Sequence, residues 1–420
     1  MYIIKNLYIH EILKDIKNEQ DIIINNLEEI RNFVNIFKKG NGLEENFNKI
    51  LKSCSNIKYI ISQKDLENNN RDVITDKIND VKISEHIDFN EIDNLLKSIN
   101  FDSTNFDTNL LCFLTLEIFK KTFDFNFIKI NEEKLKLFIL EVSKYYKNNP
   151  FHNFEHAVSV LQFTYLIISN IKISDYVSIH RLFGLMIATL VHDIDHPGHT
   201  NLFEIKNKSE LSQIYNDNSV LENHHCSTAF YILGLPQIQL LEKFSIEEFK
   251  IVRETIIESI ISTDMKYHFE LINTLEKNNN NNLINKQNEI LFCKLIIHVA
   301  DLSNQLRNFE IAYYMCQGLR KEFIKQAENE KKLNLSSQPH MEKIKNDDEF
   351  YKCEIEFCTC IIKPLIKNFC QHFPIFNYVL KNLNKNINKW KKLLMYKVIK
   401  EELFLENEEN YNDNISLNEN

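Results

Sequence analysis

The sequence predicts an all-α protein, and three of its features carry this prediction. It has only 6 glycines and 6 prolines in 420 residues, far below the roughly one residue in eight that is usual. Sandwiches, propellers and doubly wound sheets need these residues for frequent turns. Long segments also place apolar residues at helical spacing. Because 44% of the residues are hydrophobic, the helices can bury a large core.

The first predicted element is a long helix near the start of the chain. Between residues 9 and 37, nine positions follow alternating steps of four and three, and eight of them are apolar. This heptad pattern is typical of a coiled coil, and Gly40 is suited to end the helix. Further apolar residues widen the face, so an amphipathic helix packed on the main domain fits equally well. A homodimer through residues 9–37 is therefore one of two interpretations.

The chain is expected to have three parts. Residues 1–86 form a helical extension that contains the heptad segment. Residues 87–400 alternate helical patterns with short polar breaks, of which the asparagine run at 278–282 is the clearest. Residues 401–420 contain seven acidic residues and no Lys or Arg, so we expect a disordered acidic tail.

Composition and charge argue against several classes of function. A net charge of −9 without a basic patch argues against a nucleic-acid partner, because phosphate neutralisation requires a surplus of Lys and Arg. No apolar stretch approaches the ~18 residues of a membrane span. The nine cysteines include no CxxC pair, which is typical of reduced thiols. We expect a cytoplasmic protein, and a longer parent protein with a membrane anchor is also compatible.

Five segments place His, Asp or Glu at the ends of apolar helices. The richest is HDIDHPG at residues 192–198, where Pro197 and Gly198 are expected to end the apolar helix that begins near residue 182. The others are HNFEH at 152–156, LENHH at 221–225, STD at 262–264 and HVADLSN at 298–304. One such segment would be an ordinary polar helix end. Five together indicate a polynuclear metal site with nitrogen and oxygen ligands.

The segment HNFEH has a competing interpretation. It matches the HxxEH pattern of the inverted zinc proteases, in which both histidines bind one zinc and the glutamate activates water. Here these residues would be His152, Glu155 and His156. That interpretation leaves the four metal-competent side chains at 192–196 without a role.

In this order and spacing, the motifs FHNFEHA, LVHDIDHPG, YNDNSVLENHH, STDM and HVADLSN closely resemble the catalytic domain of class I cyclic nucleotide phosphodiesterases. The likeness covers roughly residues 87–400. It implies an all-helical domain of three subdomains with two divalent metals in a deep pocket. A tightly held Zn²⁺ would be bound by His156, His192, Asp193 and Asp301. Asp193 would bridge to a second metal, Mg²⁺ or Mn²⁺, whose waters would be held by His196, Glu222, His225 and Thr263.

The resemblance also implies a reaction. A hydroxide activated by both metals would hydrolyse the 3′ phosphoester bond of a 3′,5′-cyclic nucleotide to the nucleoside 5′-monophosphate, which ends cyclic nucleotide signalling. His152 would be the general acid that protonates the 3′ oxygen. Two alternatives are more distant. One is an HD-type metal phosphohydrolase acting on another nucleotide, and the other is a nucleotide-binding or dimerisation module with weakened activity.

The base end of the implied pocket departs from the family. Phe357 and Leu319 match the residues that clamp the purine, but Glu354 stands ten positions before Pro364, where the family has glutamine. An amide both donates and accepts, whereas an ionised carboxylate only accepts. A partly apolar pocket would favour the protonated carboxyl. Asn304 together with Leu319 resembles the cyclic GMP-specific branch, so the sequence favours cyclic GMP slightly over cyclic AMP.

Overall fold

The computed structural model describes residues 89–277 and 284–395, and every regular element in these two ranges is helical. The all-α prediction is confirmed. The chain divides into two compact units, Met1–Ile87 and Asp88–Asn420, and the described residues belong to the second. The predicted helix at 9–37, the asparagine run and the acidic tail lie outside the described residues.

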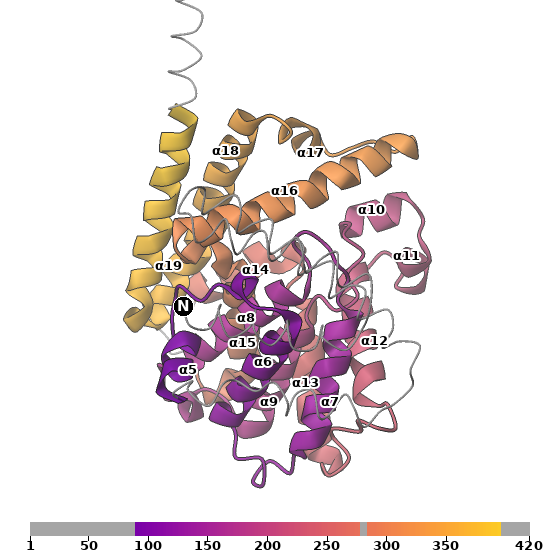
Figure 1. Cartoon of the computed structure of the whole chain (residues 1–420), viewed down its shortest axis with the longest axis vertical. Coiled ribbons are helices and arrows are strands. Elements are labelled where there is room, and N and C mark those ends of the chain that lie inside the picture. The colour runs from indigo at the N-terminus through magenta and orange to yellow at the C-terminus, as the bar shows by residue number, and fades with distance from the viewer. Residues whose placement is uncertain (1–88, 278–283, 396–420) are drawn as a thin grey trace, which may run out of the picture. The chain divides into compact units, whose positions relative to one another are not determined.

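The α-helices are mostly short and follow one another closely (Figure 1). In chain order they are α5 (Phe89–Leu96), α6 (Thr108–Thr122), α7 (Glu132–Tyr145), α8 (Phe154–Ile168), α9 (Ile179–Val191), α10 (Asn201–Lys206), α11 (Glu210–Ile214), α12 (Val220–Leu233), α13 (Ile246–Ile261), α14 (His268–Lys277), α15 (Glu289–Asp301), α16 (Phe309–Lys332), α17 (Pro339–Lys343), α18 (Asp347–Glu356) and α19 (Lys363–His372). A further helix covers residues 377–395.

The centre of this unit is formed by α8, α9, α13 and α15, in which α9 and α15 contact each other and both contact α8 and α13. All residues of α8 except Glu155 are buried, so this helix has no solvent face. The helices α9 and α13 approach closely at Gly184, where an added Cβ would lie 2.8 Å from Cβ of Thr255. A core this dense holds the helix ends that carry the polar motifs in fixed positions.

One predicted boundary was wrong. The apolar helix α9 ends at Val191, not at Pro197 and Gly198. The chain leaves the helix at His192 in successive turns, and Asp195 adopts a left-handed backbone conformation with φ of 61°. A continued helix would place His192 and His196, which are four positions apart, on one face, whereas the turns bring them into different groups of side chains.

The long helix α16 and its neighbours α17 and α18 lie on one side of the central helices (Figure 1). The backbone of α16 approaches the loop before α8 at Gly318, where an added Cβ would lie 2.5 Å from the carbonyl oxygen of Pro150. Glycine is therefore required at this contact. The approach brings α16 against the residues that precede α8.

The helix α18 continues directly into a π-helix, η7 (Phe357–Ile362), and then into α19. Glu354 lies in the last turn of α18, and Phe357 is the residue at which η7 begins. A π-helical turn changes the direction of the side chains that follow it and is frequent at functional sites.

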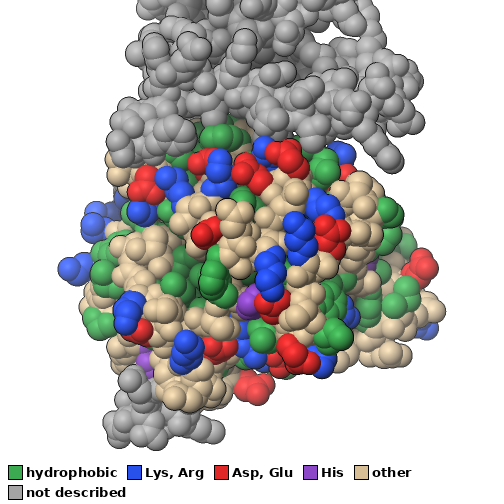
Figure 2. Space-filling model, turned by 90° about the horizontal axis from the view of Figure 1, so that it is seen from below, with side chains coloured by type: hydrophobic (Ala, Val, Ile, Leu, Met, Phe, Trp, Pro, Cys, Tyr) green, Lys and Arg blue, Asp and Glu red, His purple; other side chains and the backbone are tan. Residues whose placement is uncertain are grey.

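The surface of this unit is mixed in charge. Figure 2 shows Lys and Arg side chains interspersed with Asp and Glu on the face it presents. Within the described ranges, no helix combines the length and the apolarity that crossing a membrane requires.

Candidate metal centre and active site

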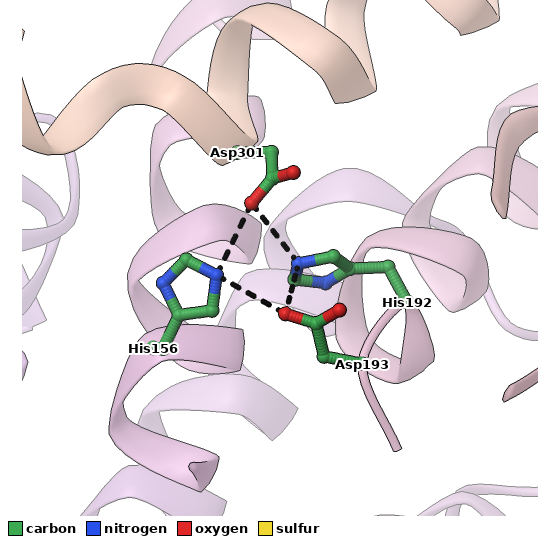
Figure 3. Close-up of side chains that lie close together, drawn as sticks. All are labelled: His156, His192, Asp193 and Asp301. Atoms are coloured by element: carbon green, nitrogen blue, oxygen red, sulfur yellow. Dashed lines mark hydrogen bonds and ion pairs between the residues drawn. The ribbon is translucent and has the colours of Figure 1, made fainter. Parts of the chain in front are cut away.

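Four of the sequence-predicted metal ligands converge from three helix ends (Figure 3). His156 lies in the first turn of α8, where the side chain of Asn153 caps the helix by accepting the backbone N–H of His156. His192 and Asp193 lie in the turn after α9, and Asp301 is the last residue of α15. Each ligand thus sits where a buried helix begins or ends, which fixes its backbone.

The distances in this cluster suit a metal ion. Nε2 of His156 lies 3.1 Å from Oδ1 of Asp301 and 3.4 Å from Oδ2 of Asp193. Nε2 of His192 lies 3.2 Å and 3.1 Å from the same two oxygens. A metal about 2.0–2.2 Å from each atom would place neighbouring ligand atoms about 3.0–3.5 Å apart. Two imidazole nitrogens and two carboxylate oxygens form a donor set suited to a divalent transition metal.

The two carboxylates of this cluster favour a positive charge between the four side chains. Nδ1 of His192 donates to the carbonyl oxygen of Thr189 at 3.1 Å, which leaves Nε2 to face the cluster, as in most metal-binding histidines. Burial lowers the pKa of His192, but Asp193 and Asp301 outweigh it and raise that pKa well above its usual value. The buried Nδ1 of His156 has no hydrogen-bond partner among the described residues.

A second cluster shares Asp193 and adds His196 and His225. Nδ1 of His225 donates to the carbonyl oxygen of Ile194 at 2.6 Å, and its Nε2 lies 3.8 Å from Oδ1 of Asp193. Nδ1 of His196 accepts the backbone N–H of Gly198 at 3.0 Å. Burial lowers the pKa of His225 to about 4 and that of His196 well below its usual value. Both imidazoles are therefore neutral, and the two oxygens of Asp193 face different clusters.

Two other predicted residues lie outside both clusters. Glu222 accepts two hydrogen bonds from Nδ2 of Asn201, at 2.9 and 3.2 Å. Burial, with the nearby Asp264, raises the pKa of Glu222 to about 7. The hydroxyl of Thr263 donates to the carbonyl oxygen of Ile260 at 2.8 Å. Their proposed role in holding metal-bound water stays a prediction.

Asp195 turns away from the metal ligands. Its carboxylate lies 2.7 Å from Nζ of Lys147 and 2.7 Å from Nε2 of His224. The left-handed backbone at Asp195 separates it from Asp193, although the two are only two positions apart. The resemblance to the family predicts a metal ligand at Asp193 and none at Asp195, and the turn between the two gives the physical reason that their side chains have different partners.

His152 is held by Glu322, a residue that sequence reasoning missed. Oε1 of Glu322 accepts the backbone N–H groups of Phe151 and His152 at 2.7 and 2.8 Å, and Oε2 lies 2.6 Å from Nδ1 of His152. An ionised carboxylate only accepts, so Nδ1 carries a proton and Nε2 is the free nitrogen. Burial lowers the pKa of His152, but Glu322 outweighs it, and the net shift is upward.

The imidazole of His152 also stacks on that of His196, with ring centroids 4.0 Å apart. His152 is grouped with His196 and Glu322, whereas His156 is grouped with His192, Asp193 and Asp301. The two histidines of HNFEH therefore belong to different clusters. This arrangement argues against the inverted zinc protease interpretation, in which both would bind one metal.

The four predicted base-contacting residues come from four separate elements. Asn304 lies in the short 3-10 helix η6 (Leu302–Leu306), Leu319 in α16, Glu354 in α18, and Phe357 begins η7. Glu354 is half-buried, and its Oε2 accepts from Nε2 of Gln305 at 2.7 Å and from the thiol of Cys316 at 3.1 Å. Sequence reasoning missed both partners, and no motif marks either of them.

Comparison with known proteins places these features in a family. The family model described as 3′5′-cyclic nucleotide phosphodiesterase matches residues 151–383. The "Dual 3′,5′-cyclic-AMP and -GMP phosphodiesterase beta" of Plasmodium falciparum is 34% identical over 358 residues, which cover 82% of this chain and 31% of that protein. The "High affinity cGMP-specific 3′,5′-cyclic phosphodiesterase 9A" of Homo sapiens is 32% identical over 254 residues, or 60% of this chain and 42% of that protein.

A solved structure is similar over most of the chain. The phosphodiesterase domain of the RhoPDE fusion protein from the choanoflagellate Salpingoeca rosetta superimposes with a TM-score of 0.69 and 32% identity, covering 76% of this chain and 99% of that domain. The matches to these two curated relatives span about a third to two fifths of their lengths. The matched region includes His152, His156, His192, Asp193 and Asp301.

Proposed function

The chain belongs to the 3′5′-cyclic nucleotide phosphodiesterase family, and from this premise we propose that it hydrolyses the 3′ phosphoester bond of a 3′,5′-cyclic nucleotide. The product would be the nucleoside 5′-monophosphate. The observation that carries the proposal is the convergence of His156, His192, Asp193 and Asp301 within one cluster, because this family depends on divalent metals.

The four clustered residues would hold the first metal, and the donor set favours Zn²⁺ there. Asp193 would bridge to a second metal, Mg²⁺ or Mn²⁺, beside His196 and His225, with Glu222 and Thr263 holding water. Divalent metals, when bound, lower the pKa of water and offset the negative charge of a phosphodiester. The neutral state of His196 and His225 suits this role, because neutral imidazoles can accept or donate hydrogen bonds to water.

His152 would act as the general acid. Glu322 fixes the proton on Nδ1 and raises the pKa of the imidazole, so that Nε2 can also carry a proton and donate it to the leaving 3′ oxygen. Three hydrogen bonds from residues 151 and 152 to one carboxylate hold the acid in place. Pre-positioning of this kind lowers the entropic cost of proton transfer.

The nucleotide preference is proposed to favour cyclic GMP. Asn304 and Leu319 support this assignment, and Glu354 and Phe357 would contact the base. One relative is named as cyclic GMP-specific and another as acting on both cyclic AMP and cyclic GMP. Those names describe the relatives, so the preference of this chain rests on its own pocket residues.

The direct test is hydrolysis of cyclic AMP and cyclic GMP by the purified full chain, with Mg²⁺ or Mn²⁺ added. We expect turnover of both, with a higher kcat/KM for cyclic GMP near neutral pH. No turnover of either nucleotide would refute the proposed function. Turnover only of another phosphate ester would favour the HD-type phosphohydrolase alternative.

Two substitutions distinguish the proposed general acid from the proposed metal ligands. His152→Ala should reduce kcat, by roughly 100-fold or more for a lost general acid, while the bound metal content stays as in the wild type. Asp193→Asn should lose metal. His180, whose Nε2 lies 3.4 Å from Glu248 and which belongs to neither cluster, offers a matched control as His180→Ala. Loss of metal from the His152 variant would contradict the assignment of the acid.

A further inference from the structure

The carboxyl group of Glu354 is bound on one side only. Both of its hydrogen bonds within the described residues end on Oε2, from Nε2 of Gln305 at 2.7 Å and from Sγ of Cys316 at 3.1 Å. Oε1 has no hydrogen-bond partner in the described part of the chain. It is also not among the fully buried side-chain oxygen and nitrogen atoms that lack a partner there. Oε1 is therefore the atom of this carboxyl group that is available to a ligand.

The amide of Gln305 cannot turn round to present its oxygen to Glu354. Its Oε1 accepts the indole N–H of Trp390 at 3.4 Å, and its Nε2 donates to Sγ of Cys316 at 2.8 Å as well as to Glu354. An indole N–H can only donate, so it keeps the amide oxygen on its own side. Trp390 is fully buried, and this arrangement is correspondingly rigid.

The fixed amide determines where Glu354 can carry a proton. Oε2 already accepts from the N–H of Gln305 and the S–H of Cys316, and the acceptor beside it is the thiol sulfur, which accepts only weakly. With a ring nitrogen of adenine as the stronger acceptor at Oε1, the proton of the neutral carboxyl is placed on Oε1. As a result, a change of charge at Glu354 converts the ligand-facing atom from a hydrogen-bond acceptor into a donor.

The groups around Glu354 allow its carboxyl group to change protonation state near neutral pH. The titratable groups that interact with it are the thiols of Cys316 on α16, Cys358 on η7 and Cys353 on α18. Burial raises the pKa of each thiol, so all three are neutral at pH 7. Burial also raises the pKa of Glu354 to about 7, despite the opposing hydrogen bonds from Cys316 and Gln305. No Lys or Arg of the described residues contributes to this shift.

We propose that Glu354 reads the purine through Oε1 alone, and that its charge sets the choice between cyclic GMP and cyclic AMP. Gln305 is then the positioning residue that keeps Oε1 in this role. The inference rests on the proposed function and extends it, because it makes the substrate preference depend on pH.

The two purines differ in the edge that they present to such an oxygen. Guanine offers N1–H and N2–H side by side, and both are donors that suit an ionised carboxylate. Adenine offers its N6 amino group next to the lone pair of N1 or N7, which repels a carboxylate but accepts from a protonated carboxyl. The preference for cyclic GMP should therefore strengthen as pH rises through the pKa of Glu354 and weaken below it.

The test is the ratio of kcat/KM for cyclic GMP to that for cyclic AMP, measured from about pH 6 to about pH 8.5, where neither purine changes charge appreciably. The metals and His152 act on the cyclic phosphate that both substrates share, so their pH dependence cancels in the ratio. We expect the ratio to rise by roughly tenfold or more, the usual effect of one charge-assisted hydrogen bond. A ratio that does not change with pH would overturn the inference.

Three substitutions test which residues cause the pH dependence of the cyclic GMP to cyclic AMP ratio. Glu354→Gln should make the ratio independent of pH, because an amide does not titrate. Gln305→Leu removes a donor to the ionised carboxylate and should move the transition to higher pH, whereas Cys316→Ser keeps a donor and should retain the transition. Persistence of the transition in Glu354→Gln would refute the role of Glu354, and an unmoved transition in Gln305→Leu would refute that of Gln305.

The outcomes distinguish this inference from the proposed function. Hydrolysis of both nucleotides at a constant ratio would defeat only the inference. Absence of hydrolysis at every pH would defeat the proposed function, and the inference would fall with it. Trp390→Phe provides a further check, since it keeps the aromatic ring but frees the amide of Gln305. It should make the dependence of the ratio on pH shallower.

Discussion

The contact between Glu322 and His152 predicts the outcome of a single isosteric substitution, Glu322→Gln. The variant can still accept the backbone N–H groups of Phe151 and His152, which now bond to Oε1 at 2.7 and 2.8 Å. It loses the negative charge that faces Nδ1 of His152 at 2.6 Å. The substitution therefore removes the electrostatic support of the imidazolium with little change in shape.

The size of the effect follows from that hydrogen bond. A hydrogen bond to a charged group contributes about 1.5–3 kcal/mol, and 1.36 kcal/mol corresponds to one pKa unit, so the pKa of His152 should fall by about 1–2 units. Carboxylates raise the pKa of His152 in the wild type. The protonated acid is present below this pKa and is lost as pH rises through it. Activity of the variant should therefore decline at a lower pH than that of the wild type.

The assay is the pH profile of kcat/KM in both proteins at saturating metal. On the alkaline side, where His152 is deprotonated in both, the variant should be about 10-fold to 100-fold less active. At low pH the two should converge, and the metal content should be equal. An alkaline limb that stays in place would refute the assignment of His152 as the acid, and loss of metal would show that Glu322 supports the metal site instead.

Two glycine contacts give further predictions. Gly318→Ala would place a Cβ 2.5 Å from the carbonyl oxygen of Pro150, so it should displace the loop that carries His152 and lower kcat without loss of bound metal; unchanged kcat would contradict this. Gly184→Ala would place a Cβ 2.8 Å from Cβ of Thr255 and 3.0 Å from the carbonyl oxygen of Val252. This overpacking should cost about 1–3 kcal/mol and lower Tm by several degrees, which thermal unfolding measures; an unchanged Tm would show that α9 and α13 separate without strain.

The segments that supply the proposed metal ligands could be recognised in the sequence because each lies next to a long apolar run, whereas the choice of individual ligands came from the resemblance to the family. His192 and Asp193 follow α9, and Asp301 ends α15, so the hydrophobic pattern itself marks where the polar residues enter the core. The position of the turn after α9 could not be predicted, because hydrogen bonds within the turn end the helix before Pro197. The fold class could be predicted from composition, because few turn-forming residues leave helices as the main option.

Glu322 and Gln305 could not be predicted, because their roles depend on contacts between distant segments. Glu322 lies 170 residues from His152, in a stretch rich in Lys and Glu that reads as a solvated helix face. Its burial is visible only once α16 lies against the loop before α8, and Gly318 allows that approach. The side-chain amide of Gln305 is oriented by the indole N–H of Trp390, which is 85 residues away. Partner identity at such distances is set by packing and not by local pattern.

One helix connects the two ends of the proposed substrate site. Cys316, Leu319 and Glu322 follow one another at steps of three along α16, so each neighbouring pair is adjacent on the helix surface, while Cys316 and Glu322 lie about 120° apart around its axis. Cys316 contacts Glu354, the proposed base-reading residue, and Glu322 holds His152, the proposed general acid. A helix rises 1.5 Å per residue, so these two contacts are about 9 Å apart along its axis. Because the helix is rigid over six residues, the spacing between base recognition and proton donation is constant. A substitution that shifts α16 at Gly318 should therefore disturb the acid and the base contact together, whereas Glu322→Gln should leave the cyclic GMP to cyclic AMP ratio unchanged.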